Sequence, residues 1–185
     1  YRQQSAAIAL LFSKLGITQE LVKTIALFPG SVWATKRWTE EGFVQAGNQL
    51  REEGHHILVM GGPGEEELCA RVAALIPGAK NICGQTSIYE SALVLSRIGG
   101  VIGNDSASLH LAATSQCPSV VMFGPTVLRF GFRPWQDQVA VVEMRDLACR
   151  PCGKHGHQVC PIGTHICMKG LEASIVTQKL KELTQ

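Results

Sequence analysis

The chain has 185 residues, enough for one generous domain or two small ones, and a chain of this size buries roughly 70% of its unfolded surface without needing disulfides or metal. Lys plus Arg number 17 and Asp plus Glu 15, so the net charge of +2 excludes a charged disordered tail and disfavours a broad electrostatic nucleic-acid binder. No apolar run reaches the roughly 18–20 residues that a membrane-spanning helix requires.

Residues 1–23 are predicted to form a helix followed by a linker, because apolar residues such as Leu11 and Leu15 recur until Gly16. The chain opens Tyr-Arg-Gln-Gln, with neither an initiator Met nor a signal peptide. We therefore expect a piece of a longer protein, in which residues 1–23 connect domains and residues 24–185 form one α/β domain.

From residue 24 onward, short apolar runs alternate with amphipathic stretches. Continuous apolar runs are typical of strands covered on both faces of a parallel sheet. Thr39 and Gly54 are expected to begin and end one helix, and Ser87 with Glu90 forms a capping box at another. The alternation predicts right-handed crossovers and a doubly wound sheet. The expected strands are Thr24–Phe28, His56–Met60, Lys80–Cys83, Val101–Gly103, Ser119–Phe123 and Val139–Glu143.

The loop after the first strand carries a candidate anion site. Ligands of such sheets bind beyond the carboxyl ends of the strands. There Gly30 permits close backbone approach, Ser31 offers a hydroxyl, and Lys36 and Arg37 add positive charge near a helix start. The alternative is an ordinary surface loop with solvated basic residues.

The loop after the second strand, Gly61-Gly62-Pro63-Gly64-Glu65, suggests a tight turn. The Glu65 carboxylate can accept hydrogen bonds from a ribose diol. Alternatively, Glu65 only complements the positive end of the following helix.

The loop after the fourth strand is the most informative. Asp105 places a carboxylate at the strand end, Ser106 opens a helix whose amino terminus faces a bound anion, and His110 follows one turn later on the same side. The alternative is that Asp105 or Ser106 merely caps the helix and His110 is a core histidine. Because Gly124 and Thr126 follow the fifth strand at the same edge, the loops together favour a phosphate-containing ligand.

These motifs occur in a recognisable order. The series resembles the carboxyl-terminal half of ADP-heptose:lipopolysaccharide heptosyltransferases, glycosyltransferase family nine. The resemblance implies a GT-B architecture, with two Rossmann-like domains and the active site between them, of which residues 24–185 are the donor-binding domain. The matching segments are Phe28-Pro29-Gly30-Ser31, Lys36-Arg37-Trp38, Gly61-Gly62-Pro63-Gly64-Glu65, Gly103-Asn104-Asp105-Ser106, His110-Leu111-Ala112 and Phe123-Gly124-Pro125-Thr126.

The resemblance also implies a function: inverting transfer of heptose from ADP-heptose to lipopolysaccharide core, with no cofactor at the chemical step. Lys36 and Asp105 are the implied catalytic residues, and Ala107 stands where many relatives have glycine. A base in an amino-terminal domain would deprotonate the acceptor, so this chain alone is expected to bind donor weakly and transfer nothing. The implied donor-binding residues are Ser31 and Lys36 for the phosphates, Glu65 for the ribose, Thr86 near the base, and Ser106, Ala107 and His110.

Seven cysteines fall into two groups. Three are expected to be small core residues, and four lie in one loop, residues 146–168, where their spacing suits a closed structural zinc or iron site. Disulfides and free thiols are the alternatives for the loop, and three histidines there can substitute for a thiolate. Related autotransporter heptosyltransferases hold iron with cysteines, which the resemblance extends to this loop. The core group is Cys69, Cys83 and Cys117; the loop holds Cys149, Cys152, Cys160 and Cys167 with His155, His157 and His165.

Two other functions stay open: a GT-B transferase that uses another nucleotide sugar such as a UDP-sugar, and a metal-stabilised interaction module. The module lacks a stacking platform for nucleic acid, because Trp135 has no aromatic run near it, so no nucleic-acid partner is expected. The basic residues available to it are Arg145, Arg150, Lys154 and Lys169. By resemblance, the protein is expected in the cytoplasm, with peripheral contact at the inner membrane where the lipopolysaccharide-core acceptor is made.

Overall fold

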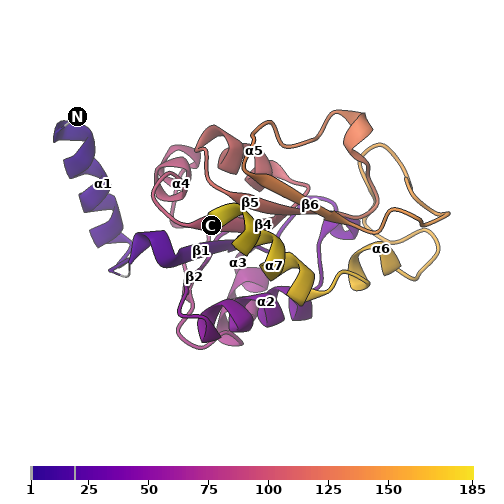
Figure 1. The fold of residues 1–185 in the computed structure, drawn as a ribbon, viewed down its shortest axis with the longest axis horizontal. Coiled ribbons are helices and arrows are strands. Elements are labelled where there is room, and N and C mark those ends of the chain that lie inside the picture. The colour runs from indigo at the N-terminus through magenta and orange to yellow at the C-terminus, as the bar shows by residue number, and fades with distance from the viewer. Residues whose placement is uncertain (1, 19) are drawn as a thin grey trace.

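A computed structural model describes the backbone of residues 2–18 and 20–185, and the side chains of residues 7–18 and 20–185. Six strands form one sheet in the order β3-β2-β1-β4-β5-β6, and every neighbouring pair is parallel (Figure 1). This is the strand order of a doubly wound Rossmann sheet, so the predicted fold class is confirmed.

All six expected strands are present, and the bounds predicted for the first, fifth and sixth are those observed. The third is shorter than predicted, because the Asn81 side-chain oxygen accepts a hydrogen bond from the Cys83 N–H at 3.0 Å and turns the chain out of the sheet. The strands are β1 (Thr24–Phe28), β2 (His56–Val59), β3 (Lys80–Asn81), β4 (Gly100–Asn104), β5 (Ser119–Phe123) and β6 (Val139–Glu143).

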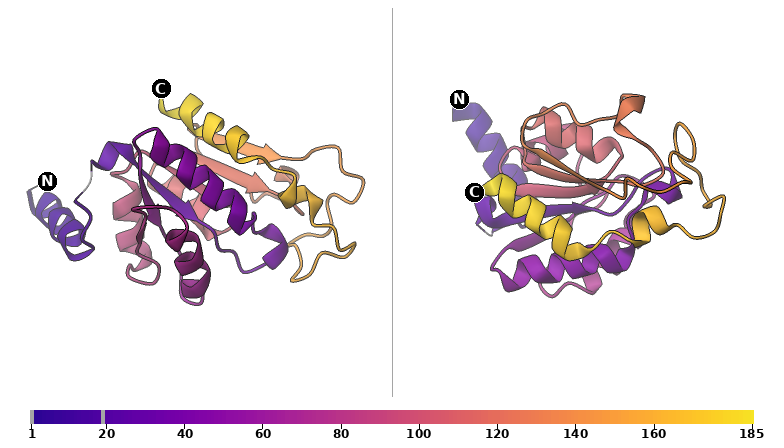
Figure 2. Two further views of the ribbon diagram at one scale, coloured as in Figure 1. Left: turned by 90° about the horizontal axis from the view of Figure 1, so that it is seen from below. Right: turned by 45° about the vertical axis from the view of Figure 1, so that its right-hand side comes forward.

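The sheet separates two hydrophobic cores. In β1, which is buried along its whole length, Ile25 and Leu27 pack into the core under α2, α3 and α7, whereas Ala26 and Phe28 pack into the core that α1 and α4 share. Figure 2 shows the resulting layers of helix, sheet and helix. The helices are α1 (Arg2–Lys14), α2 (Glu40–Glu52), α3 (Glu66–Ala74), α4 (Ile88–Leu95), α5 (Ala107–Thr114), α6 (Ile166–Lys169) and α7 (Ala173–Thr184).

Two helix starts confirm the predicted caps. The Thr39 hydroxyl accepts a hydrogen bond from the Gly42 N–H at 3.0 Å at the start of α2. Ser87 and Glu90 form the reciprocal capping box at the start of α4. These capping residues fix where α2 and α4 begin, and so where the loops at the carboxyl edge of the sheet end.

The order of the strands reverses between β1 and β4, which lie side by side at the centre of the sheet. The chain leaves their carboxyl ends in opposite directions, so the two loops that follow meet at one place. Residues 146–165 fold over that same end of the molecule, whereas α1 lies at the opposite end (Figure 1). Within the described residues, no helix combines the length and apolar character needed to cross a membrane.

Candidate functional site

The two residues expected to be catalytic touch each other at the junction of β1 and β4. Lys36 ends a short 3-10 turn (Ala34–Lys36) in the loop after β1, and Asp105 directly follows β4. The Lys36 Nζ atom lies 2.7 Å from Asp105 Oδ2, and their side chains are only 8% and 3% exposed. The Thr126 hydroxyl donates to the same carboxylate oxygen at 2.6 Å. Charges this deeply buried persist only when they are paired and hydrogen-bonded.

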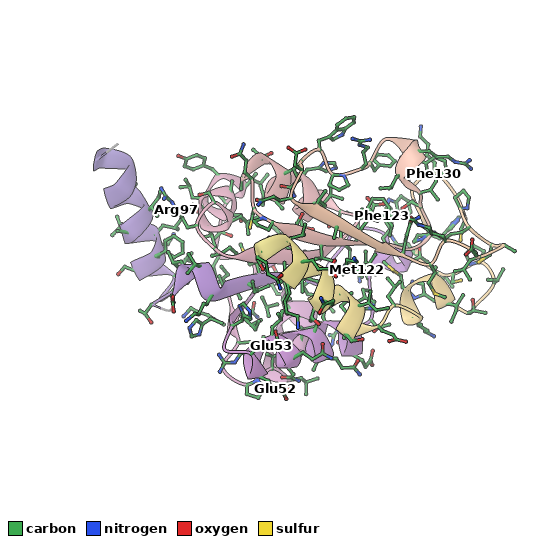
Figure 3. The ribbon with its side chains drawn as sticks, viewed as in Figure 1. Glu52, Glu53, Arg97, Met122, Phe123 and Phe130 are labelled. Atoms are coloured by element: carbon green, nitrogen blue, oxygen red, sulfur yellow. The ribbon has the colours of Figure 1, made fainter. Side chains whose placement is uncertain are left out.

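An aromatic side chain covers the ion pair. The Lys36 ammonium lies 5.2 Å from the ring centroid of Phe132, a cation–π distance. Phe132 belongs to the loop between β5 and β6. Figure 3 labels Phe123, the last residue of β5, and Phe130, which lies in this loop. The Phe132 ring therefore covers one side of the ammonium.

Asn104, the last residue of β4, joins the two loops. Its side-chain oxygen accepts a hydrogen bond from the Trp38 N–H at 2.8 Å. Its amide nitrogen lies 3.4, 3.0 and 3.1 Å from the carbonyl oxygens of Phe28, Pro29 and Gly30, respectively. Asn104 has no exposed surface, so this buried amide holds the loop after β1 in shape. Asn104 lies in the motif Gly103-Asn104-Asp105-Ser106, and its position at the end of a buried strand beside an Asp is the sequence signal for this role.

Glu65 brings the loop after β2 to the same place. Its carboxylate accepts a hydrogen bond from the Gly62 N–H at 2.9 Å. A Cβ atom on Gly30 would lie 1.9 Å from Glu65 Oε1, so only glycine leaves room for the carboxylate there. Gly30 therefore lies against Glu65, whereas its close approach to a bound anion stays a prediction.

The other predicted donor-binding residues are placed less centrally. Ser31 is buried in the loop after β1, whereas the hydroxyl of Thr86 contacts Ser91 within α4 at 2.7 Å. Ser106 precedes α5, but its hydroxyl contacts Ser108 at 2.9 Å and does not cap the helix. Ala107 and His110 are exposed, so the alternative of a core histidine is wrong. No contact of the structure joins Thr86 or His110 to the ion pair within the described residues.

A pocket of about 310 Å³ borders the loop after β1 on its α2 and α3 side. A larger pocket of about 650 Å³ lies at the opposite edge of the sheet, beside Gln116 and Gln138, away from the ion pair. The smaller pocket is lined by Pro29, Ala34, Arg37, Trp38, Thr39, Glu40, Glu41, Leu68, Arg71 and His165.

All seven cysteines are free thiols, and the three expected in the core are buried. In the loop, burial raises the pKa of the Cys167 thiol to about 11, with smaller effects from the other three cysteines. A hydrogen bond from the His165 N–H lowers the pKa of the Cys160 thiol. Within the part of the chain that the structure describes, no three His, Cys, Asp or Glu side chains form a group that could hold a metal ion. As they lie, the four cysteines do not form the closed tetrahedral site that their spacing suggests.

The loop histidines and Arg150 have other partners. The Nε2 atom of His157 donates to the Cys152 carbonyl at 2.7 Å, and that of His165 donates to the Thr35 carbonyl at 2.9 Å. The Arg150 side chain, 3% exposed, pairs with Glu143 at 2.6 Å. Arg150 is therefore not available to a nucleic acid, which weakens the interaction-module hypothesis further.

Comparison with known proteins identifies one group. The family model described as glycosyltransferase family 9 (heptosyltransferase) matches residues 3–162. Lipooligosaccharide heptosyltransferase 2 of Campylobacter jejuni (serotype O:6, strain 81116) is 32% identical over 168 residues, which make up 88% of this chain and 52% of that protein. The chain thus spans about half the length of this curated relative.

Two solved structures share the fold. Escherichia coli ADP-heptose lps heptosyltransferase II matches with a TM-score of 0.79 at 20% identity, over 96% of this chain and 50% of that one. The dodecameric iron-containing heptosyltransferase TibC of enterotoxigenic E. coli, solved with ADP-D-beta-D-heptose, matches with a TM-score of 0.65 at 15% identity, over 86% of this chain and 44% of that one.

Proposed function

The chain belongs to glycosyltransferase family 9, and from that premise we propose that it is the donor-binding half of an inverting heptosyltransferase that takes heptose from ADP-heptose to lipopolysaccharide core. One observation carries the proposal: a buried Lys36–Asp105 ion pair lies at the switch point of a doubly wound sheet, where such folds bind nucleotides. The substrates named for the relatives support the choice of donor and acceptor.

Lys36 is proposed to hold the donor diphosphate. An ammonium group has three N–H donors, and one is directed at Asp105, which leaves two for phosphate oxygens. When the bond from heptose to the diphosphate breaks, negative charge develops on the leaving group, and a fixed cation stabilises it. Asp105 keeps the ammonium oriented, while Ser31 and the amino terminus of α5, with Ser106 and Ala107, add polar groups around the phosphates.

Glu65 is proposed to bind the ribose hydroxyls, because its carboxylate lies on Gly30, beside the loop that carries Lys36. Thr86 is proposed to lie near the base and His110 near the heptose. We assign the base that deprotonates the acceptor hydroxyl to the half of the relatives that this chain does not match. Acceptor binding and any peripheral contact with the inner membrane belong to the same unmatched half, and the protein is proposed to act in the cytoplasm.

Calorimetric titration of the chain with ADP and UDP tests the proposal. We expect ADP to bind at least about tenfold more tightly than UDP, a difference of about 1.4 kcal/mol. Weaker binding of AMP than of ADP is the matched check that the second phosphate is recognised. Tighter binding of UDP would replace the heptose donor with a UDP-sugar, and no binding of either would overturn the assignment of a nucleotide site.

We also propose that Cys149, Cys152, Cys160 and Cys167 bind a structural zinc or iron ion, for which the thiols must move from their positions in the structure. The effect of the other three loop cysteines, smaller than that of burial, in raising the pKa of Cys167 agrees with their lying in one region. The hydrogen bond from His165 to the Cys160 sulfur, at 3.4 Å, stabilises a thiolate. A filled tetrahedral site leaves no open position, so the ion would have no catalytic role.

Elemental analysis of protein purified without chelator tests the metal proposal. We expect about one equivalent of zinc plus iron, and loss of most of it in Cys160→Ser. Cys117→Ala, which changes a core cysteine, should leave the metal content unchanged. Less than about a tenth of an equivalent in the unmodified chain would overturn the metal site.

A further inference from the structure

The cysteine-rich segment, residues 149–165, lies against the turn that carries Lys36, and the proposed donor chemistry makes no use of it. Both views of Figure 2 show this segment beside the turn at the same end of the molecule. The two parts are far apart in the sequence, so their contacts are a product of the tertiary fold. These contacts converge on Thr35, the neighbour of Lys36.

Every polar group of Thr35 is bonded to the segment. The Thr35 N–H donates to the His157 carbonyl at 3.0 Å, and the Thr35 hydroxyl donates to the same carbonyl at 2.8 Å. The hydroxyl also accepts from the His157 N–H at 2.8 Å, and the Thr35 carbonyl accepts from His165 Nε2 at 2.9 Å. Thr35 is 5% exposed, so these bonds are shielded from competing water.

Other hydrogen bonds support the ends of the turn and do not involve Thr35: Arg37 Nε donates to the Ser31 carbonyl at 2.8 Å, and the Trp38 N–H donates to Asn104. Within the turn, the Lys36 N–H donates to the Trp33 carbonyl at 2.9 Å and the Arg37 N–H to the Ala34 carbonyl at 3.1 Å. A 3-10 turn of three residues is too short to hold a fixed position by itself. A lysine side chain also has several rotatable bonds, so the place of its ammonium depends on where the backbone is held.

The segment packs on Lys36 itself and also reaches the other member of the ion pair. A Cβ atom on Gly156 would lie 3.4 Å from Lys36 Cγ, so the backbone of the segment lies on the lysine stem. On the other side, Arg150 Nη2 donates to the Thr126 carbonyl at 2.8 Å, and the Thr126 hydroxyl holds Asp105. The cysteine-rich segment therefore contacts Thr35, which is next to Lys36, and Thr126, which is hydrogen-bonded to Asp105.

We propose that Thr35 is a positioning residue: it fastens the Lys36 turn to the cysteine-rich segment and so aligns the ammonium with Asp105 and with the diphosphate of a bound nucleotide. The inference rests on the proposed function for the nucleotide. The attachment itself is a separate claim, because the mobility of the turn can be measured without any ligand.

Thr35→Val tests the proposal, because valine keeps the shape of threonine and removes the hydroxyl. We expect amide exchange in residues 32–37 of the 185-residue chain to rise about tenfold and the Kd for ADP to rise about tenfold. Thr35→Ser restores the hydroxyl and is expected to restore both quantities to within about threefold of the unmodified chain.

A matched control separates positioning from general stability. Thr177 is 3% exposed, and its hydroxyl donates to Gln49 Oε1 at 2.9 Å, between α7 and α2. Thr177→Val therefore loses a buried hydroxyl far from the turn, and we expect it to lower the melting temperature but to leave exchange at residues 32–37 and the Kd for ADP unchanged.

A double variant shows whether Thr35 acts through Lys36. In a Lys36→Ala background, Thr35→Val should add no further loss of ADP affinity, because the group that it positions is absent. An additive loss, or unchanged exchange in Thr35→Val alone, would overturn the positioning role. If the unmodified chain binds no ADP, the proposed function fails, whereas the exchange experiment still decides whether Thr35 fastens the turn.

Discussion

Lys36→Ala is expected to weaken ADP binding by the chain about hundredfold, to abolish heptose transfer by a full-length enzyme, and to destabilise the fold by about 3–5 kcal/mol. The binding loss follows from removal of the cation proposed to hold the diphosphate. The destabilisation follows from burial: Asp105 is 3% exposed and would keep a charge without its partner. From the sequence alone, this substitution is expected to leave folding intact; the closed ion pair changes that expectation.

Two further variants separate the two effects. Lys36→Met combined with Asp105→Asn removes both charges, and because a neutral pair has no buried charge to compensate, urea unfolding should recover most of the lost free energy. Its ADP affinity should stay as low as that of Lys36→Ala. Wild-type affinity in this double variant would contradict the role of Lys36 in binding the donor.

A surface ion pair provides the matched control. Lys181 Nζ lies 2.8 Å from Glu53 Oε1, with side chains 34% and 40% exposed; Glu53 is labelled in Figure 3 at the end of α2. Lys181→Ala should change the free energy of unfolding by less than about 1 kcal/mol and leave ADP binding unchanged, because solvent screens an exposed pair.

Asn104→Ala is expected to lower the free energy of unfolding by about 3 kcal/mol and to weaken ADP binding. The substitution leaves the buried Trp38 N–H unpaired and removes the donor shared by three carbonyl groups of the loop after β1. Since that loop carries Ser31 and Lys36, its loosening should also raise amide exchange there. Urea unfolding, calorimetry and hydrogen exchange measure the three effects.

Two comparisons sharpen this prediction. Asn104→Asp keeps an acceptor for the Trp38 N–H but turns a carboxylate toward carbonyl oxygens, so it should be at least as destabilising as the alanine variant. Asn48→Ala removes an amide that donates to the Leu75 carbonyl at 3.4 Å on the surface, and it should cost less than about 0.5 kcal/mol. Equal losses of unfolding free energy in Asn48→Ala and Asn104→Ala would show that Asn104 does not hold the loop after β1 in place.

The sheet could be predicted because its signals are local. A buried parallel strand reads as a continuous apolar run, and β1, β5 and β6 begin and end where those runs do. Helix starts depend on a hydroxyl and a backbone N–H three residues apart, as at Thr39 and Gly42. The short β3 was overestimated because an Asn81 side chain ends the strand, a competition between side chain and backbone that apolar periodicity does not register.

The sequence by itself determined the succession of strands and helices along the chain, the helix caps, and the edge of the sheet where the polar loops lie. Each of these depends on residues a few positions apart. Only the tertiary structure decided which loop residues meet: Lys36 with Asp105, Glu65 with Gly30, and Thr35 with His157, 122 positions away. Such meetings depend on how whole layers pack and on where each loop is anchored. The residues next to a position in the chain do not specify that packing. The exposure of His110 and the contacts of Thr35 with the cysteine-rich segment therefore could not be predicted from the sequence.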